Sequence, residues 1–319
     1  MKTQLKNSKS VFRLAGRLFS RAACVGAIIL ICSSASGENL LVSGNGGLKN
    51  CQRGGCGVVY KFTWDGGQSI FAGGLTDPWD LAFDSAGNLY AVDYDRSGRL
   101  GDAAIYKIAP NGARTTFASG LSYPSYLAVD RAGNVFVADY NRGIIYEHKP
   151  TGSRATFATG LHHPTGLAFD SLGNLFVADN SAGNIYDGSI FEYRQNGSRT
   201  TFAVLNASDR PADLAFDNMG NLFMADLNGN IYKYNLNGVL RPHVRTIFGS
   251  VPNSAQSLAF DSVGNLLVVN AGNLNSTGTG APSAIYKLTQ QGVRSTFASG
   301  QGSSESFACL AFQPMVCCQ

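Results

Sequence analysis

The side chains best suited to binding chemistry stand at one repeated position of this sequence, directly before a Leu-Ala pair. The two residues before each pair differ from copy to copy. They are Trp79-Asp80, Ser125-Tyr126, Thr165-Gly166, Ala212-Asp213, Gln256-Ser257 and Ala308-Cys309. Aromatic rings stack on ligands, hydroxyls and amides form hydrogen bonds with them, and carboxylates attract cations. Such variation predicts a ligand surface, and its candidate residues are Trp79, Asp80, Tyr126, Thr165, Asp213 and Gln256.

The frame that carries these positions is an internal repeat of roughly 45 residues, a period typical of propellers and solenoids. The segment LAFDSAGNLYAVD, residues 81–93, returns four more times with small changes, and a sixth copy ends early at LAFQP, residues 310–314. Each complete unit contains four short segments rich in β-branched and aromatic residues, separated by Gly-Asn turns. Four strands in a unit of this length predict one β-propeller blade.

Two details of the repeat fit a blade. The middle residue of each predicted first strand is alanine, which suits the narrow space where blades converge. These residues are Ala82, Ala128, Ala168, Ala215, Ala259 and Ala311. The Asp-x-x-Gly-Asn turn joins the first two strands, because glycine adopts positive φ and the aspartate caps the turn.

The sixth blade is divided between the two ends of the chain. Segments 39–44, 58–62 and 69–74 match the second, third and fourth strands of the repeat, and 309–314 matches its first strand. Joining them closes the ring and leaves no open sheet edge. The sequence therefore predicts an all-β fold, a six-bladed β-propeller of four-stranded antiparallel blades in one domain, 38–319, closed by a C-terminal innermost strand.

The first 37 residues have the pattern of a secretory signal peptide. Six Lys and Arg residues without any acid precede or enter an apolar run at 22–35, which is shorter than the ~20 residues of a membrane span. The rest of the chain holds 19 basic and 21 acidic residues, a poor match for nucleic acid. We expect a secreted or periplasmic protein with no membrane span after signal removal.

Cysteines gather in the terminal segments that build the sixth blade. Cys309 precedes its first strand, whereas Cys51 and Cys56 lie in the loop between its second and third strands. These two places share one face of a propeller, so we expect a disulfide between Cys309 and Cys51 or Cys56 in an oxidising compartment. The alternative is a local Cys51–Cys56 bridge with Cys309 simply buried.

The repeat P-x-x-L-A-F-D-x-x-G-N-L-F-V-A-D resembles that of bacterial NHL-repeat proteins and, more widely, of the gluconolactonase and senescence-marker-protein propellers. Those lactonases hold a divalent cation over the central channel. The family's Glu-Gly-Pro motif corresponds to Thr76-Asp77-Pro78 here, and the resemblance leaves Asp77, Asp80 and Asp213 as the acidic metal candidates. Thr165 replaces the family's asparagine, and Asp213 is displaced by one residue, so the lactonase site is incomplete.

The long loops between second and third strands share the face of the Leu-Ala positions, so ligand binding is expected there. Trp79, Tyr123 and Tyr126 are candidates to stack a sugar or peptide, unless Trp79 fills the channel as core. The aspartates that close the second strands are expected to bind backbone amides, with a ring of metal ligands as the alternative. They are Asp93, Asp139, Asp179 and Asp226.

The predicted function is a module that binds a small molecule, a glycan or an envelope protein through its loop-rich face. No cofactor is predicted for this function. The alternative is a divalent-metal-dependent lactonase-type hydrolase, for which the cation is calcium or zinc.

Overall fold

The structure, a computed structural model, describes residues 39–45, 57–64, 67–94, 103–180, 188–206, 208–235, 245–271, 282–300 and 307–313. These residues form six four-stranded antiparallel sheets, and each sheet is one blade of a propeller. Residues 1–38, which include the predicted signal peptide, lie outside the described residues. No helix among the described residues is long and apolar enough for a membrane span.

The strands follow one another from the centre of the ring outward in each blade. Blade 1 contains β4 (Pro78–Phe83), β5 (Leu89–Asp93), β6 (Ala103–Ile108) and β7 (Arg114–Leu121). Blade 2 contains β8 (Pro124–Val129), β9 (Val135–Asp139), β10 (Ile144–His148) and β11 (Arg154–Ala158). Blade 3 contains β12 (Pro164–Phe169), β13 (Leu175–Asp179), β14 (Ser189–Tyr193) and β15 (Arg199–Val204).

The remaining three blades complete the set. Blade 4 contains β16 (Pro211–Phe216), β17 (Leu222–Asp226), β18 (Asn230–Tyr234) and β19 (Arg245–Ser250). Blade 5 contains β20 (Ser257–Phe260), β21 (Leu266–Asn270), β22 (Ala284–Leu288) and β23 (Arg294–Ser299). Blade 6 contains β24 (Phe307–Phe312), β1 (Leu40–Asn45), β2 (Gly57–Phe62) and β3 (Gln68–Leu75).

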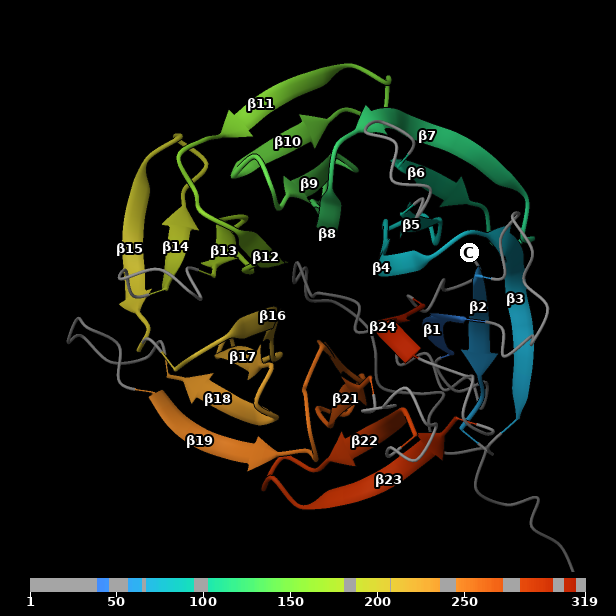
Figure 1. Ribbon diagram of the computed structural model, residues 1–319, viewed down its shortest axis with the longest axis vertical. Coiled ribbons are helices and arrows are strands. Elements are labelled where there is room, and N and C mark those ends of the chain that lie inside the picture. The colour runs from blue at the N-terminus through green and yellow to red at the C-terminus, as the bar shows by residue number, and fades with distance from the viewer. Residues whose placement is uncertain are drawn as a thin grey trace, which may run out of the picture. The chain divides into compact units, whose positions relative to one another are not determined.

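Blade 6 closes the ring as the sequence predicts. The C-terminal strand β24 pairs with the N-terminal β1, with Leu40 opposite Phe312 and Val42 opposite Leu310. The pairing extends past the strand ends, because the Gln313 amide donates a hydrogen bond of 3.0 Å to the Asn39 carbonyl. The innermost strands contact one another in the closed order β4, β8, β12, β16, β20, β24 and back to β4 (Figure 1).

The hydrophobic core lies between blades. The second strands of blades 1 to 5 are buried at every residue, because both of their faces are covered by sheet. A Phe of one blade packs edge-on against the Leu-Ala-Phe phenylalanine of the next, as in Phe136 with Phe169 and Phe223 with Phe260, at centroid distances of 5.1 and 4.9 Å. Buried apolar clusters recur between each pair of neighbouring blades.

The Asp-x-x-Gly-Asn turns have the predicted structure. In the first copy, Asp84 Oδ1 accepts hydrogen bonds from the amides of Ala86 and Asn88 at 3.0 and 2.8 Å, and Gly87 has φ of 80°. The same bonds recur in the four other copies. These tight turns join the first and second strands at one face. The variable residues before each Leu-Ala pair lie toward the opposite end of each first strand.

Candidate functional site

A pocket of about 320 Å³ lies at the face where the first strands begin, and we call it the mouth pocket. Four of the predicted ligand residues line it, namely Trp79, Tyr126, Thr165 and Gln256. The other lining residues are Tyr94, Tyr123, Pro124, Ser125, Tyr140, Asn180, Pro211, Ala212 and Leu227. No side chain among these described lining residues carries a formal charge. The pocket combines aromatic surface with neutral hydrogen-bonding groups, as ligand sites do.

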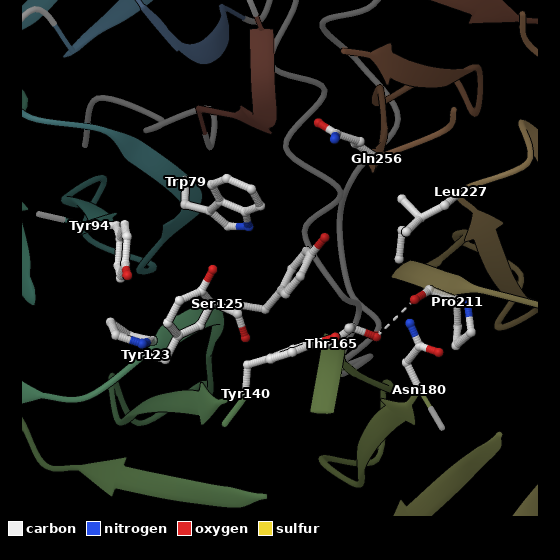
Figure 2. Close-up of a pocket in the computed structure, with 13 residues that line it drawn as sticks. Trp79, Tyr94, Tyr123, Ser125, Tyr140, Thr165, Asn180, Pro211, Leu227 and Gln256 are labelled. Carbon is white, nitrogen blue, oxygen red and sulfur yellow. Dashed lines mark hydrogen bonds between the residues drawn. The ribbon is translucent and has the colours of Figure 1, made fainter. Parts of the chain in front are cut away.

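Aromatic rings occupy one side of the mouth pocket, and they come from the adjacent blades 1 and 2. Figure 2 shows Trp79, Tyr94, Tyr123 and Tyr140 on this side, with Pro211 and Leu227 opposite them. Ring centroids are 4.8 Å apart for Tyr94 and Tyr123, and 5.8 Å apart for Tyr123 and Tyr140. Such contacts hold the rings in fixed orientations, and Trp79 remains 37% exposed. Its exposed surface is therefore available for contact.

Tyr94 and Tyr140 were not among the sequence candidates. Each directly follows the aspartate that closes the second strand of its blade, Asp93 or Asp139. In blades 3 and 4 the same position supplies Asn180 and Leu227, which also line the pocket. The residue after the second-strand aspartate is thus a second variable position at the mouth. Comparison of that position across the repeats would have found both tyrosines.

The residues next to the Leu-Ala pairs form a belt of hydrogen bonds around the axis, which joins each innermost strand to the next. An innermost strand pairs with a second strand on one side only. Its N–H and C=O groups that face the axis of the ring therefore lack ladder partners. Asp80 Oδ2 accepts from the Leu127 amide at 2.7 Å, and Asp213 Oδ2 accepts from the Leu258 amide at 2.8 Å. We call Asp80, Ser125, Thr165, Asp213, Ser257 and Cys309 the interblade belt.

The four other belt residues make the remaining links. The Ser125 hydroxyl donates to the Pro164 carbonyl at 3.3 Å, and Thr165 Oγ1 donates to the Pro211 carbonyl at 3.2 Å. Ser257 Oγ lies 3.2 Å from Cys309 Sγ, and the Cys309 thiol donates to Asp80 Oδ1 at 2.7 Å. Variation at these positions therefore has a structural component, because aspartate, serine, threonine and cysteine side chains all link neighbouring innermost strands at the ring centre.

Two belt residues are buried acids whose ionisation is disfavoured. They line a second cavity of about 270 Å³, the central cavity, which is bordered by the innermost strands. Burial raises the pKa of Asp80 to about 6, although hydrogen bonds from Cys309 and Leu127 partly offset the shift. Burial and then the charge of Asp80 raise the pKa of Asp213 to about 7. Perturbed carboxyls in a cavity mark candidate functional groups.

The predicted metal candidates, Asp77, Asp80 and Asp213, are not grouped into one cluster in the described part of the chain. Among the residues that the structure describes, no three His, Cys, Asp or Glu side chains are grouped closely enough to hold a metal ion. Asp80 and Asp213 use their oxygens on backbone amides and on Cys309, and Asp77 lies outside the central cavity. A hard cation prefers several converging oxygens, which these three carboxyls do not present.

Among the described residues Cys309 is a buried free thiol, and its disulfide with Cys51 or Cys56 stays a prediction. Its sulfur is directed to Asp80 and Ser257 in the belt, and burial followed by the charge of Asp80 raises the pKa of the thiol. Cys51 and Cys56 lie outside the described residues. The belt explains the direction of the sulfur, because the residue directly before Leu310-Ala311 points its side chain toward the neighbouring innermost strands.

The aspartates at the ends of the second strands bind backbone amides, as predicted. Asp93 accepts hydrogen bonds from the amides of Thr76 and Asp77 at 2.8 to 3.0 Å, and Asp179 holds the amides of His162 and His163 in the same way. Asp139 and Asp226 accept from amides of the following turn. These carboxylates fix the segments that carry the mouth residues.

Comparison with solved structures supports the fold. No protein-family model matches the chain, and no curated protein matches its sequence. A structure of a nidogen–laminin complex contains a chain that is 17% identical, with a TM-score of 0.68 over 88% of this chain and 100% of that one. A putative gluconolactonase is 14% identical, with a TM-score of 0.58 over 74% of this chain and 88% of that one.

A gluconolactonase from Xanthomonas campestris is 21% identical, with a TM-score of 0.53 over 66% of this chain and 75% of that one. Identities this low support the architecture alone, since one fold serves binding proteins and enzymes alike. The fold and the mouth pocket define the class of this protein as a six-bladed β-propeller that is structurally similar to nidogen-type and gluconolactonase-type propellers.

Proposed function

We propose that this protein is an exported binding module whose ligand occupies the mouth pocket. The observation that carries the proposal is the gathering of five aromatic residues from two blades around one pocket of about 320 Å³. Pockets of this size and apolar character are typical of ligand sites. The turns at the opposite face are short and repeat one structure. Secretion or periplasmic location follows from the signal-peptide pattern of residues 1–37.

The test uses the two tryptophans of the chain, which have equal exposure of 37% at different places. Trp79 lines the mouth pocket, whereas Trp64 packs against Phe297 and Phe312. Mature protein, residues 38–319, is screened for binding to glycans, small metabolites and envelope proteins. We expect Trp79→Leu to weaken the binding that is found and Trp64→Leu to leave it unchanged. Equal effects of both substitutions would refute the mouth as the binding site.

A metal-dependent hydrolase of the lactonase type is the second candidate function. The observation in its favour is the pair of buried carboxyls, Asp80 and Asp213, on the axis below the mouth. The described residues contain no group of three His, Cys, Asp or Glu side chains that could hold an ion, so this function would need further ligands beside the two carboxyls. Metal analysis and thermal unfolding with calcium or zinc test this function, with Asp213→Ala as the control. A stoichiometric ion that the variant loses would favour the hydrolase.

A further inference from the structure

The mouth pocket and the central cavity lie one residue apart along the innermost strands. Trp79, Ala212 and Gln256 line the mouth pocket. Each is followed directly by a belt residue that lines the central cavity, and these belt residues are Asp80, Asp213 and Ser257. The uncharged mouth pocket therefore lies next to a layer that contains two carboxyl groups.

Tyr126 connects the two layers. It lines the mouth pocket from β8, next to Leu127, whose amide binds Asp80. Burial raises the pKa of the Tyr126 hydroxyl, and the charges of Asp213 and Asp80 raise it further. The two acids therefore lie close enough to influence the Tyr126 hydroxyl. When they are ionised, the inner end of this aromatic pocket is electronegative.

Aromatic surface together with negative potential matches one class of ligand. The face of an aromatic ring attracts cations through its quadrupole, and quaternary ammonium groups are the ligands best known for binding within aromatic cages. A small inorganic cation prefers several charged oxygen ligands, and no side chain that lines the mouth pocket carries a formal charge. A primary ammonium or guanidinium group carries N–H donors, each of which needs an acceptor when buried. A quaternary ammonium carries no N–H donor, so aromatic faces and a nearby negative charge satisfy it without acceptors.

We propose that the mouth pocket binds an organic cation, a quaternary ammonium group of the trimethylammonium type, held by Trp79, Tyr94, Tyr123, Tyr126 and Tyr140 and attracted by Asp80 and Asp213. This inference rests on the proposed function of the mouth pocket as the binding site. The aromatic side chains surround the cation on the side of blades 1 and 2. Asn180 and Gln256, on other blades, lie where they contact the rest of the ligand.

The first experiment compares choline with 3,3-dimethyl-1-butanol, which has the same shape without the charge. Binding is followed by tryptophan fluorescence in a Trp64→Phe background, so that Trp79 is the only reporter, and by calorimetry on the wild-type chain. We expect saturable binding of choline and at least tenfold weaker binding of the neutral alcohol, as cation–π and charge attraction require. Equal affinities, or no choline binding, would overturn the proposal.

The second experiment uses matched variants. We expect Trp79→Leu to weaken choline binding about tenfold, a loss between those of an exposed and a fully desolvated cation–π contact, whereas Trp64→Leu leaves it unchanged. At pH 8, where Asp213 is mostly ionised, Asp213→Asn removes a negative charge next to the pocket and is expected to weaken choline binding several-fold without affecting the neutral alcohol. Asp261→Asn is the control, because Asp261 is also buried and amide-bonded but lies in a turn between first and second strands. Equal effects of the two aspartate substitutions would contradict the electrostatic part.

The wild-type chain gives an independent readout if Asp213→Asn does not fold. Asp80 and Asp213 lie among Cys309, Ser257 and Tyr126, and neither acid has a basic side chain among its main influences. A cation favours their ionised forms, so choline affinity should rise from pH 5.5 to pH 8. Affinity that is independent of pH would overturn the role of the carboxyls.

Failure of the inference is distinguishable from failure of the proposed function. A neutral glycan that binds in a Trp79-dependent manner, together with no response to choline, would refute the organic cation and keep the mouth as the binding site. Choline binding that Trp79→Leu and Trp64→Leu weaken equally would refute both.

Discussion

The belt acids predict that this protein loses stability as the pH rises, and Asp213→Asn should remove most of that loss. Asp213 has a pKa of about 7 in the folded chain against an ordinary value of 3.8, a difference of about 3 units. Each unit corresponds to about 1.4 kcal/mol, so the folded state is weakened by up to about 4 kcal/mol between pH 4 and pH 8. The shift of Asp80 is not added, because its charge already contributes to that of Asp213.

The direction of the change in stability with pH follows from proton binding. Between the two pKa values the folded state binds more protons than the unfolded state at Asp213, and stability falls as the pH rises through that window. Asparagine keeps the carbonyl acceptor for the Leu258 amide but loses one other acceptor contact, which costs about 1 kcal/mol at every pH. The variant should therefore be slightly less stable than wild type at pH 4.5 and more stable at pH 8.

Urea denaturation of both proteins at pH 4.5, 6, 7 and 8 measures this difference. The comparison also cancels the contribution of His148, whose pH dependence has the opposite sign. If the unfolding free energies of wild type and Asp213→Asn differ by the same amount from pH 4.5 to pH 8, the reasoning is refuted. It would show that Asp213 is ionised or protonated equally in the folded and unfolded chains.

Three further predictions concern other buried groups. Desolvation lowers the pKa of the buried His148 to about 4. As the pH falls from 7 to 4.5, the free energy of unfolding of His148→Leu should therefore rise by up to about 3 kcal/mol relative to wild type, as urea denaturation would show. A Cβ at Gly166 would lie 2.5 Å from Asp213 Cα. Gly166→Ala should therefore lower the free energy of unfolding by about 1–3 kcal/mol, because it separates β12 from β16. Ser198→Ala, at an exposed turn, should lower it little. Cys309 should resist iodoacetamide in the folded protein and react after unfolding without reductant, as mass spectrometry of labelled peptides would show; labelling only after reduction would indicate the predicted disulfide.

The fold was predictable because its causes are local and repeated. The Asp-x-x-Gly-Asn turn, with Gly87 and its equivalents at positive φ, fixes each inner hairpin. Alanine and phenylalanine in the Leu-Ala-Phe segment fix how each blade packs on the next. Repetition makes these weak local preferences act together, and the matching of 39–44 with the repeat even reveals the closure by β24 and β1.

The site was predictable only in part, because two functions of one position look alike in a single sequence. In the variable pair of blade 1, Trp79 lines the mouth pocket and Asp80 is a belt residue, whereas in blade 2 Ser125 joins the belt and lines the pocket together with Tyr126. Strand alternation separates the two roles, but the irregular register at the start of these first strands obscures it. The contact between Cys309 and Asp80 joins residues 229 positions apart, which no local pattern records.

The composition of the belt supports a functional reading of its acids. The Ser257 hydroxyl accepts a hydrogen bond from the Leu310 amide, as Asp80 and Asp213 accept from the amides of Leu127 and Leu258, so this kind of interblade link does not require a carboxyl. Ser125 and Thr165 link their blades by donating to backbone carbonyls instead. Asp80 and Asp213 make their links at the expense of ionisation in a buried place, as their raised pKa values show. Departures from the most stable choice are expected at functional sites. Asp80 and Asp213 both lie next to the aromatic mouth pocket, where a negative charge attracts a cation. Hydroxyl groups at these two positions would not supply that charge.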